Sequence, residues 1–308
     1  MRFLRREEGG IFFALVLMFV GLSFTSPEFL SRENLLTVAR QFSVIGIISV
    51  GMTFVIVAGE IDLSVGSVLA LSGCIAAQLT VEHGWSLPAA GAVAIAAGAL
   101  AGTANGLLTV RLGIPSFIIT LGMMSVIRGL TYVLTEAMPI SIPEEFRFLG
   151  YGTLFGVSVP VVVMGLVAVA GGIVLSLTPF GRHVYATGGS IEAARLSGVP
   201  TGRVRVIVFG VLGALAALAG ILNSAWVTVA QPVAGIGYEL DVIAAVIIGG
   251  ASFSGGKGTV LGTMLGATLM GFLRNGLILL GVNVYWQQVA IGGVIVLAVA
   301  LDRLRRGK

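Results

Sequence analysis

Charged and chemically reactive side chains are scarce in this chain. Only 10% of its 308 residues are Asp, Glu, Lys or Arg, whereas soluble globular proteins carry about 25%. A single cysteine, Cys74, excludes an intrachain disulfide and is expected to be a small buried side chain. His83 and His183 stand far apart in the sequence, which leaves little material for a metal site or a catalytic triad. The sequence therefore predicts neither an enzyme nor a bound cofactor or metal on this chain.

Apolar residues and glycine dominate instead. The chain is 56% hydrophobic, has 45 glycines and has a mean hydropathy of +1.04. Its apolar runs are too continuous for β-barrel strands, which alternate over about ten residues. Gly98, Gly102 and Gly106 recur every fourth residue, a spacing that favours close helix packing and could also line a solute path. The predicted fold class is an all-α polytopic membrane protein with one transmembrane domain, residues 1–308.

The apolar residues form ten candidate transmembrane segments. These are 11–24, 42–58, 63–80, 88–110, 115–135, 159–177, 206–230, 240–252, 259–280 and 286–301. A full span needs about 20 residues, so the first and the eighth are short. The first is interpreted as a retained span, because no clear cleavage site follows it. The eighth starts beside Glu239 and Asp241, and it could be a full span, a re-entrant segment or a broken helix enclosed by protein.

The basic residues predict the orientation in the membrane. Ten spans place both termini on one side, and cytoplasmic loops of membrane proteins are enriched in Lys and Arg. With cytoplasmic termini, 13 basic residues lie inside: Arg2, Arg5, Arg6, Arg111, Arg182, Arg195, Arg203, Arg205, Lys257, Arg303, Arg305, Arg306 and Lys308. Three lie in outer loops: Arg32, Arg40 and Arg147. The net charge of +4 therefore marks topology, and no nucleic-acid partner is expected.

The longest polar interruption is the loop 178–205. Within it, Ser190 can cap a helix, Glu192 suits a first turn, and Gly198 can end the helix. The loop could be a solvated connection with an incidental helix, or it could dock a cytoplasmic partner and transmit its motion to the spans. The residues that we expect to dock are Ser190, Glu192, Ala193, Ala194, Arg195, Leu196, Ser197 and Gly198.

A second glycine-rich stretch, 254–259, only superficially suggests nucleotide binding. A phosphate-binding loop requires the pattern G-x-x-x-x-G-K-[ST]. Here Gly258 follows Lys257, and no strand is expected before it. The chain is therefore not expected to bind ATP itself.

Several polar residues in or beside the spans are candidates for a translocation path. They are Glu60, Asp62, Asn105, Arg128, Asn223, Arg274 and Asn275. The two acids lie at the cytoplasmic end of the predicted spans, where water can reach, and could cap the third helix or act in gating or pairing with a neighbouring loop. Arg128 could extend to the outer headgroups or face a central path. The others could hold helices together or contact solute. A weak internal echo links 60–63 to 239–242, since both read Glu-x-Asp-x.

Three stretches resemble the permease subunits of ABC importers for monosaccharides, the ribose/xylose/arabinose type within the branched-chain amino acid/sugar permease superfamily. They are 51–71 (GMTFVIVAGEIDLSVGSVLAL), 115–135 (PSFIITLGMMSVIRGLTYVLT) and 180–199 (FGRHVYATGGSIEAARLSGV). The chain departs from the family pattern at Glu60, where a second glycine is usual, and at Ser190, where Asn is frequent.

The resemblance implies a type II ABC importer-like permease with about ten transmembrane helices, in the bacterial inner membrane. It implies that two permeases, identical or different, work with two cytoplasmic ATPase subunits that bind ATP and Mg. It also implies a periplasmic or lipid-anchored sugar-binding protein and contact with membrane lipid. An ion-coupled secondary carrier or channel is the alternative, although such a carrier is expected to hold acids deep in its spans. The sequence leaves the sugar open, because the binding protein largely selects it.

Overall fold

The computed structural model describes residues 6–306. The basic residues near the two chain ends, which contribute to the predicted orientation, lie outside the described residues wholly or in their side chains: Arg2, Arg5, Arg6, Arg303, Arg305, Arg306 and Lys308.

Each of the ten predicted segments coincides with a helix, which confirms the all-α fold class. The helices are α1 (Arg6–Thr25), α2 (Arg32–Val57), α3 (Val65–Val81), α4 (Leu87–Leu112), α5 (Ser116–Thr135), α7 (Val159–Leu177), α10 (Thr201–Val227), α11 (Tyr238–Ile248), α12 (Val260–Leu279) and α13 (Val284–Arg306). Within the described chain, five helices are long and apolar enough to cross a membrane, namely α2, α4, α5, α7 and α10. That all ten segments cross it stays a prediction.

Two helices, α2 and α10, form the centre of the bundle. Helix α10 packs against α2, α3 and α4, while α2 also contacts α7, α11 and α12. Their facing side chains, such as Ile47, Phe209 and Leu212, are fully buried. A Cβ atom at Gly102 of α4 would overlap the Phe209 carbonyl oxygen of α10. The glycines at every fourth residue of α4 therefore allow close packing against α10.

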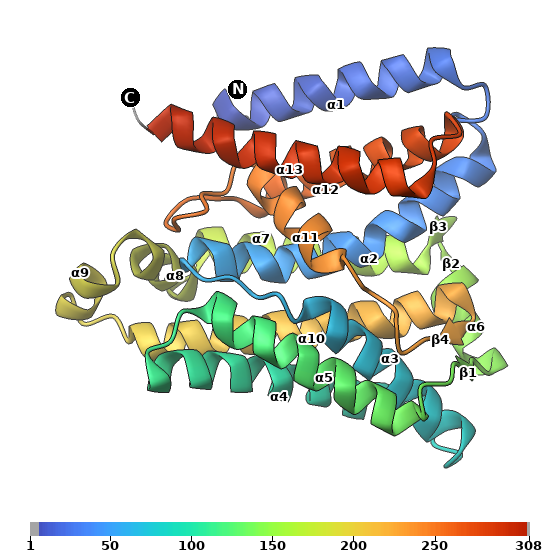
Figure 1. Cartoon of the computed structure of the whole chain (residues 1–308), viewed down its shortest axis with the longest axis horizontal. Helices are drawn as coiled ribbons and strands as arrows, with labels where there is room; N and C mark the ends of the chain where they lie inside the picture. Colours follow the sequence, from blue (N-terminus) through green and yellow to red (C-terminus); the bar gives the residue numbers. More distant parts are fainter. Residues whose placement is uncertain (1–5, 307–308) are drawn as a thin grey trace.

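Small elements cover one end of the bundle, at the right of Figure 1. Strand β1 (Ile140–Ser141) pairs with β4 (Val229–Ala230), and β2 (Thr153–Leu154) pairs with β3 (Val157–Ser158), both antiparallel. Between β1 and β2 lie a 3₁₀ turn (Glu144–Phe146) and α6 (Arg147–Tyr151). The β1–β4 pair ties the connection after α5 to the connection after α10.

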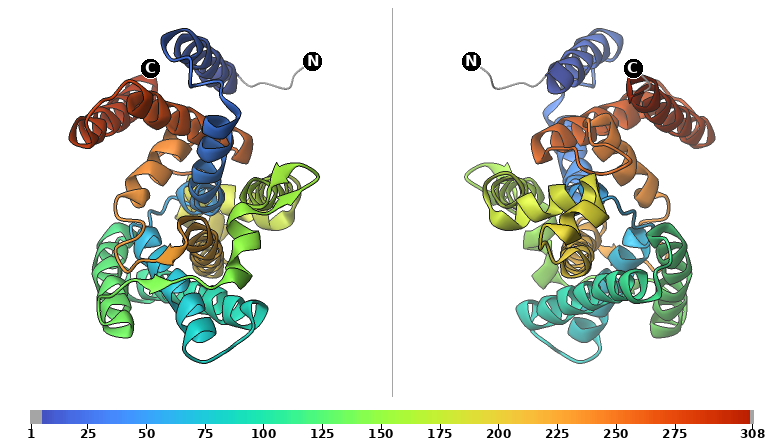
Figure 2. Two further views of the ribbon diagram at one scale, coloured as in Figure 1. Left: turned by 90° about the vertical axis from the view of Figure 1, so that its right-hand side faces the viewer. Right: turned by 90° about the vertical axis from the view of Figure 1, so that its left-hand side faces the viewer.

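The opposite end carries α8 (Pro179–Gly189) and α9 (Ile191–Leu196). Figure 1 shows that α1 begins and α13 ends at this same end, and the end-on views of Figure 2 show both helices on one flank. In the described part of the chain, the start of α1 and the end of α13 therefore lie on the same side of the bundle. Which side of the membrane that is stays a prediction.

Several helix boundaries differ from those expected, and one helix was not expected. Helix α2 begins at Arg32, so Arg40 lies in the helix and not in an outer loop as predicted. Its charge is accommodated there because Nε donates to Ser158 Oγ at 3.3 Å and the guanidinium lies over the Tyr151 ring. Helix α8 was not predicted, although Thr178 caps it by accepting from Gly181 N at 3.2 Å. Likewise Arg203 and Arg205 belong to α10 and not to the loop.

Two crossings are broken by non-helical stretches. Residues 58–64 lead from the end of α2 into the middle of the bundle, where α3 begins, and residues 231–237 lead from β4 to the start of α11 in the same region (Figure 1). The stretches touch, because a Cβ at Gly66 would overlap the Gly235 carbonyl oxygen. With 11 residues, α11 does not cross a bilayer alone. The eighth segment is therefore a short helix preceded by a non-helical stretch, and its crossing of the membrane stays a prediction.

Candidate functional site

Helix α9 forms as the sequence predicts. Ser190 Oγ accepts a hydrogen bond from Ala193 N at 3.2 Å, which satisfies one of the free amides at the start of the helix. The helix ends before Gly198, whose φ of +84° is the left-handed conformation typical of glycine after a helix.

The outward surface of α9 is apolar with charged neighbours. Leu196 is 80% exposed and Ile191 is also exposed, while Ala194 faces inward and is buried. Of the other residues expected to dock, Glu192, Ala193, Arg195, Ser197 and Gly198 are all exposed. An exposed leucine beside charges at the tip of a bundle is suited to contact another protein.

Helix α8 links α9 to the bundle through backbone contacts. A Cβ at Gly188 would overlap the Val57 carbonyl oxygen at the end of α2. The same carbonyl accepts from Gly256 N at 2.8 Å, and the Tyr185 hydroxyl donates to the Gly258 carbonyl at 2.6 Å. Helix α8 therefore contacts both the end of α2 and the 249–259 connection between α11 and α12.

Glu60 forms an ion pair with Arg205 of α10. Both side chains are largely buried, at 6% and 18% exposure. The expectation that water reaches Glu60 is wrong, because α10 starts earlier than predicted and brings Arg205 against it. Of the roles considered for this acid, the structure shows pairing, although the partner lies in helix α10 and not in a neighbouring loop. The sequence marked Arg205 only as a topology signal.

Asp62 organises the start of α3. Its Oδ1 accepts from Ser64 N and Ser64 Oγ, both at 2.7 Å, and its Oδ2 accepts from Asn105 Nδ2 at 3.2 Å. Asn105 Nδ2 also donates to Ser64 Oγ at 2.8 Å. Asp62 therefore binds Ser64, the N-cap residue of α3, which makes no side-chain capping bond itself. Asp62 is only 2% exposed, so the expected access of water is wrong here too.

The remaining polar candidates hold the bundle together. Arg128 Nη1 donates to the carbonyls of Pro232 and Ala234, so the structure shows it anchoring the stretch before α11, a partner that neither expectation included. Asn275 exchanges hydrogen bonds with Asn34 of α2 at 2.8 and 3.2 Å. Asn223 is buried within α10.

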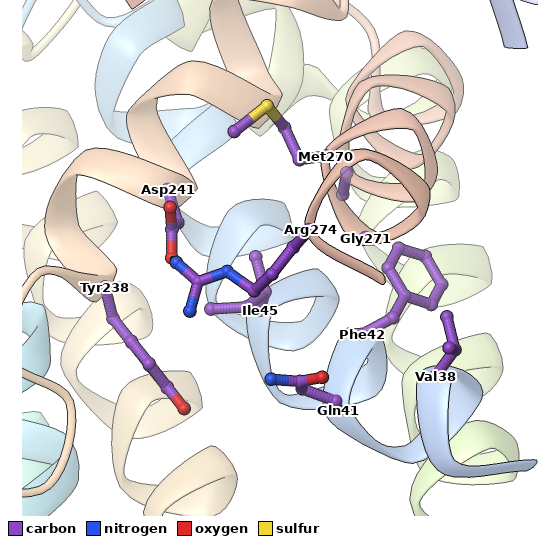
Figure 3. Close-up of a pocket in the computed structure, with 10 residues that line it drawn as sticks. Val38, Gln41, Phe42, Ile45, Tyr238, Asp241, Met270, Gly271 and Arg274 are labelled. Atoms are coloured by element: carbon purple, nitrogen blue, oxygen red, sulfur yellow. The ribbon is translucent and has the colours of Figure 1, made fainter. Parts of the chain in front are cut away.

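Arg274 lies apart from these residues, in a narrow and partly open pocket between α2, α11 and α12. Its Nη2 contacts Asp241 Oδ2 at 2.7 Å. Figure 3 shows Tyr238 and Gln41 around the same space. The sequence singled out Arg274 but missed Gln41, Tyr238 and Asp241 as its neighbours. The Glu-x-Asp echo could have marked Asp241 as a candidate, whereas nothing in the sequence distinguishes Gln41 or Tyr238 from other polar residues.

Among the residues that the structure describes, no group of three His, Cys, Asp or Glu side chains could hold a metal. Glu60 and Asp241 are instead paired with Arg205 and Arg274. The arrangement combines an exposed short helix at one end, backbone contacts and ion pairs between the helices, and a polar pocket inside the bundle.

Comparison with known proteins identifies the architecture. Residues 34–299 match the family described as "Branched-chain amino acid transport system / permease component". The "Ribose import permease protein RbsC" of Escherichia coli (strain K12) is 43% identical over 298 residues, covering 95% of this chain and 92% of that protein. The "L-arabinose ABC transporter permease protein AraH" of Azospirillum brasilense is 38% identical over 304 residues, covering 98% and 89%. No solved structure gives a significant match. The chain therefore belongs to the family of branched-chain amino acid transport system permease components.

Proposed function

We propose that this chain is the membrane-spanning subunit of an ATP-driven ABC importer that carries a monosaccharide across the bacterial inner membrane. The observation that carries the proposal is the similarity, over nearly the full chain, to permeases named for ribose and L-arabinose. A protein named for D-allose, "D-allose transport system permease protein AlsC" of Escherichia coli (strain K12), is 38% identical over 97% of the chain. A monosaccharide is the class that these names share.

In this proposal ATP and Mg bind to a separate ATPase subunit, and α9 is the docking helix. The exposed Leu196 and Ile191 would bury apolar area against that subunit. The residues of α9, the chain ends and the loop 178–205 would then face the cytoplasm. A second permease, identical or different, and a sugar-binding protein complete the importer, with the binding protein at the end that carries β1 to β4.

The charge pairing favours this function over an ion-coupled carrier. Ion coupling is expected to use acids within the spans that can exchange a proton or metal ion. Here the buried carboxylates have protein partners: Glu60 pairs with Arg205, Asp241 with Arg274, and Asp62 accepts three hydrogen bonds. Free energy for transport would therefore come from the partner through α9.

The test is sugar uptake into proteoliposomes that contain the permease with its binding protein, with and without the ATPase subunit. D-Ribose, L-arabinose, D-allose and D-xylose are assayed in parallel. Uptake of one of them that requires both ATPase and ATP is expected. Uptake that persists without the ATPase and follows a proton or sodium gradient would overturn the proposal.

A variant in α9 tests the docking assignment within the same assay. Glu192→Lys reverses an exposed charge in the first turn of the helix. It should abolish ATPase association and uptake while leaving membrane insertion intact. A variant that copurifies with the ATPase and transports normally would show that α9 does not dock it.

A further inference from the structure

The pocket between α2, α11 and α12 has one polar side and one apolar side. The polar side consists of Gln41, Tyr238, Asp241 and Arg274. On the apolar side, Phe42 and Val38 of α2 lie beside Gly271 of α12, as Figure 3 shows. A pocket with polar groups at one side and a ring at the other can orient a small ligand that has both kinds of surface.

The polar groups have bonding capacity left for a ligand. Asp241 and Arg274 bind each other through one oxygen and one nitrogen, and the Arg274 side chain remains 34% exposed. For the Gln41 amide and the Tyr238 hydroxyl, the described residues provide no hydrogen-bond partner, yet both side chains line the pocket and are partly buried. Half-buried amides and hydroxyls without protein partners are available to bind water or solute.

The chemistry of this set fits a neutral polyhydroxylated ligand. Asp241 accepts hydrogen bonds, Arg274 donates them, and Gln41 and Tyr238 can do both. A sugar hydroxyl also donates and accepts, so it can satisfy several of these groups at once. The charges of Asp241 and Arg274 cancel in their ion pair, which disfavours a charged ligand. The Phe42 ring offers an apolar face to the C–H side of a sugar ring.

The location of the pocket fits a solute that enters from the end carrying the β-strands. Gln41 lies about 14 Å along α2 from its start at that end, at 1.5 Å per residue. Arg274 lies five residues before the end of α12. The contact between Gly66 and Gly235, which joins the two broken crossings, lies near the start of α11, the helix that also supplies Tyr238 and Asp241. The pocket is thus beside the contact that joins the two non-helical stretches.

We propose that this pocket binds the transported monosaccharide during its passage, with Gln41, Tyr238 and the Asp241–Arg274 pair contacting its hydroxyls and Phe42 its ring. This inference rests on the proposed function. It adds a site within the permease itself to the recognition provided by the binding protein. Gln41 and Tyr238 are the binding residues that can be altered without breaking an ion pair.

The test combines direct binding with transport. Saturation-transfer NMR is recorded on the purified permease in nanodiscs with D-ribose, L-arabinose, D-allose and D-xylose, and uptake by the reconstituted importer is measured for the same sugars. Tyr238→Phe removes one oxygen, and Gln41→Leu removes the amide at similar volume. Tyr132→Phe in α5, outside the pocket lining, is the matched control.

For the sugar that the wild-type importer takes up, each pocket variant should lower the NMR signal at least threefold and raise KM at least threefold with little change in kcat. The control should behave as wild type, and unfolding temperatures should confirm that all three variants fold. Unchanged signal and KM in both folded variants, or no signal from the wild type with the sugar it transports, would overturn the pocket assignment. Absence of ATP-dependent uptake of every sugar by the wild type would instead overturn the proposed function.

If both pocket variants fail to fold, Gly271→Ala provides the deciding measurement. A Cβ at this position would meet Phe42 at 3.5 Å, an ordinary van der Waals contact, so the helix can accept it. It narrows the pocket without altering a polar group, and the same threefold rise in KM is expected. A folded Gly271→Ala importer with wild-type KM and NMR signal would overturn the assignment.

Discussion

The guanidinium of Arg205 lies against the carboxylate of Glu60 in a buried ion pair. Arg205 is in α10, which follows α9 after a four-residue link. Glu60 lies in the non-helical stretch 58–64, which runs beside α5, where Ile61 N and Leu63 N donate to Ser116 Oγ and Thr120 Oγ1. The pair therefore joins α10, the helix that follows α9, to the stretch that leads to Asp62 and α3.

We first predict that Glu60→Gln destabilises the protein. Removing one partner of a buried ion pair leaves an uncompensated charge and costs about 3–5 kcal/mol. Unfolding in detergent, followed by intrinsic fluorescence, measures the change. The reversed pair Glu60→Arg with Arg205→Glu should recover part of the loss.

The control is the exposed Glu144–Arg147 pair, whose side chains are 82% and 72% exposed. Glu144→Gln should leave stability within about 0.5 kcal/mol of wild type, since exposed pairs contribute little. Equal stability of Glu60→Gln and wild type would show that the buried pair is not needed for the fold.

The second prediction concerns the exposed leucine of α9. Leu196→Glu should reduce copurification of the ATPase subunit at least tenfold without changing the unfolding temperature, because the side chain is largely in solvent. Leu154→Glu places the same change on exposed β2 at the other end of the bundle. Loss of ATPase binding in both variants, or in neither, would argue against docking through α9.

A third prediction separates two adjacent glycines at the end of α8. Gly188→Ala forces a Cβ into the backbone at Val57, and overpacking of this kind typically costs about 1–3 kcal/mol. Gly189→Ala meets nothing within 4 Å and should be neutral. Thermal unfolding gives the stability difference, and the ratio of sugar imported to ATP hydrolysed should fall for Gly188→Ala alone. Matching values for the two variants would contradict the close contact of α8 with α2.

The fourth prediction tests the orientation with introduced cysteines. Native Cys74 is buried and should not react with a membrane-impermeant maleimide. Phe155→Cys, at the exposed tip between β2 and β3, should react in intact spheroplasts. Leu196→Cys should react only after the membrane is opened. The opposite pattern would place α9 outside and invert the assignment from the basic residues.

Hydropathy and helix-capping chemistry were sufficient to predict much of the fold. The ten apolar segments coincide with helices because burial of apolar side chains and internal backbone bonding are both required in a membrane. Helix α9 was predicted with its cap, because Ser190 and Gly198 act locally. Helix α8 was missed because it begins with Pro179 directly after α7 and is held by tertiary contacts such as Tyr185 to Gly258.

The pairing of polar residues could not be read from one sequence. Glu60 and Arg205, or Asp241 and Arg274, are far apart along the chain and have no periodicity that links them. Arg128 was expected to reach the lipid headgroups or to face a translocation path. Its actual partners are backbone carbonyls, which no side-chain pattern in the sequence can indicate. The first copy of the Glu-x-Asp echo lies in the stretch 58–64 before α3, and the second lies in the first turn of α11, just after the stretch 231–237.

The short length of α11 affects how the chain inserts into the membrane. Its 11 residues include Glu239 and Asp241 in the first turn, so the segment is too short and too polar to partition into lipid by itself. It becomes stable in the membrane only when Arg274 of α12 arrives to neutralise Asp241 and when α2 covers it. We therefore expect α11 to enter the bilayer together with α12, and a nascent chain that stops before α12 to lack the partner that neutralises Asp241.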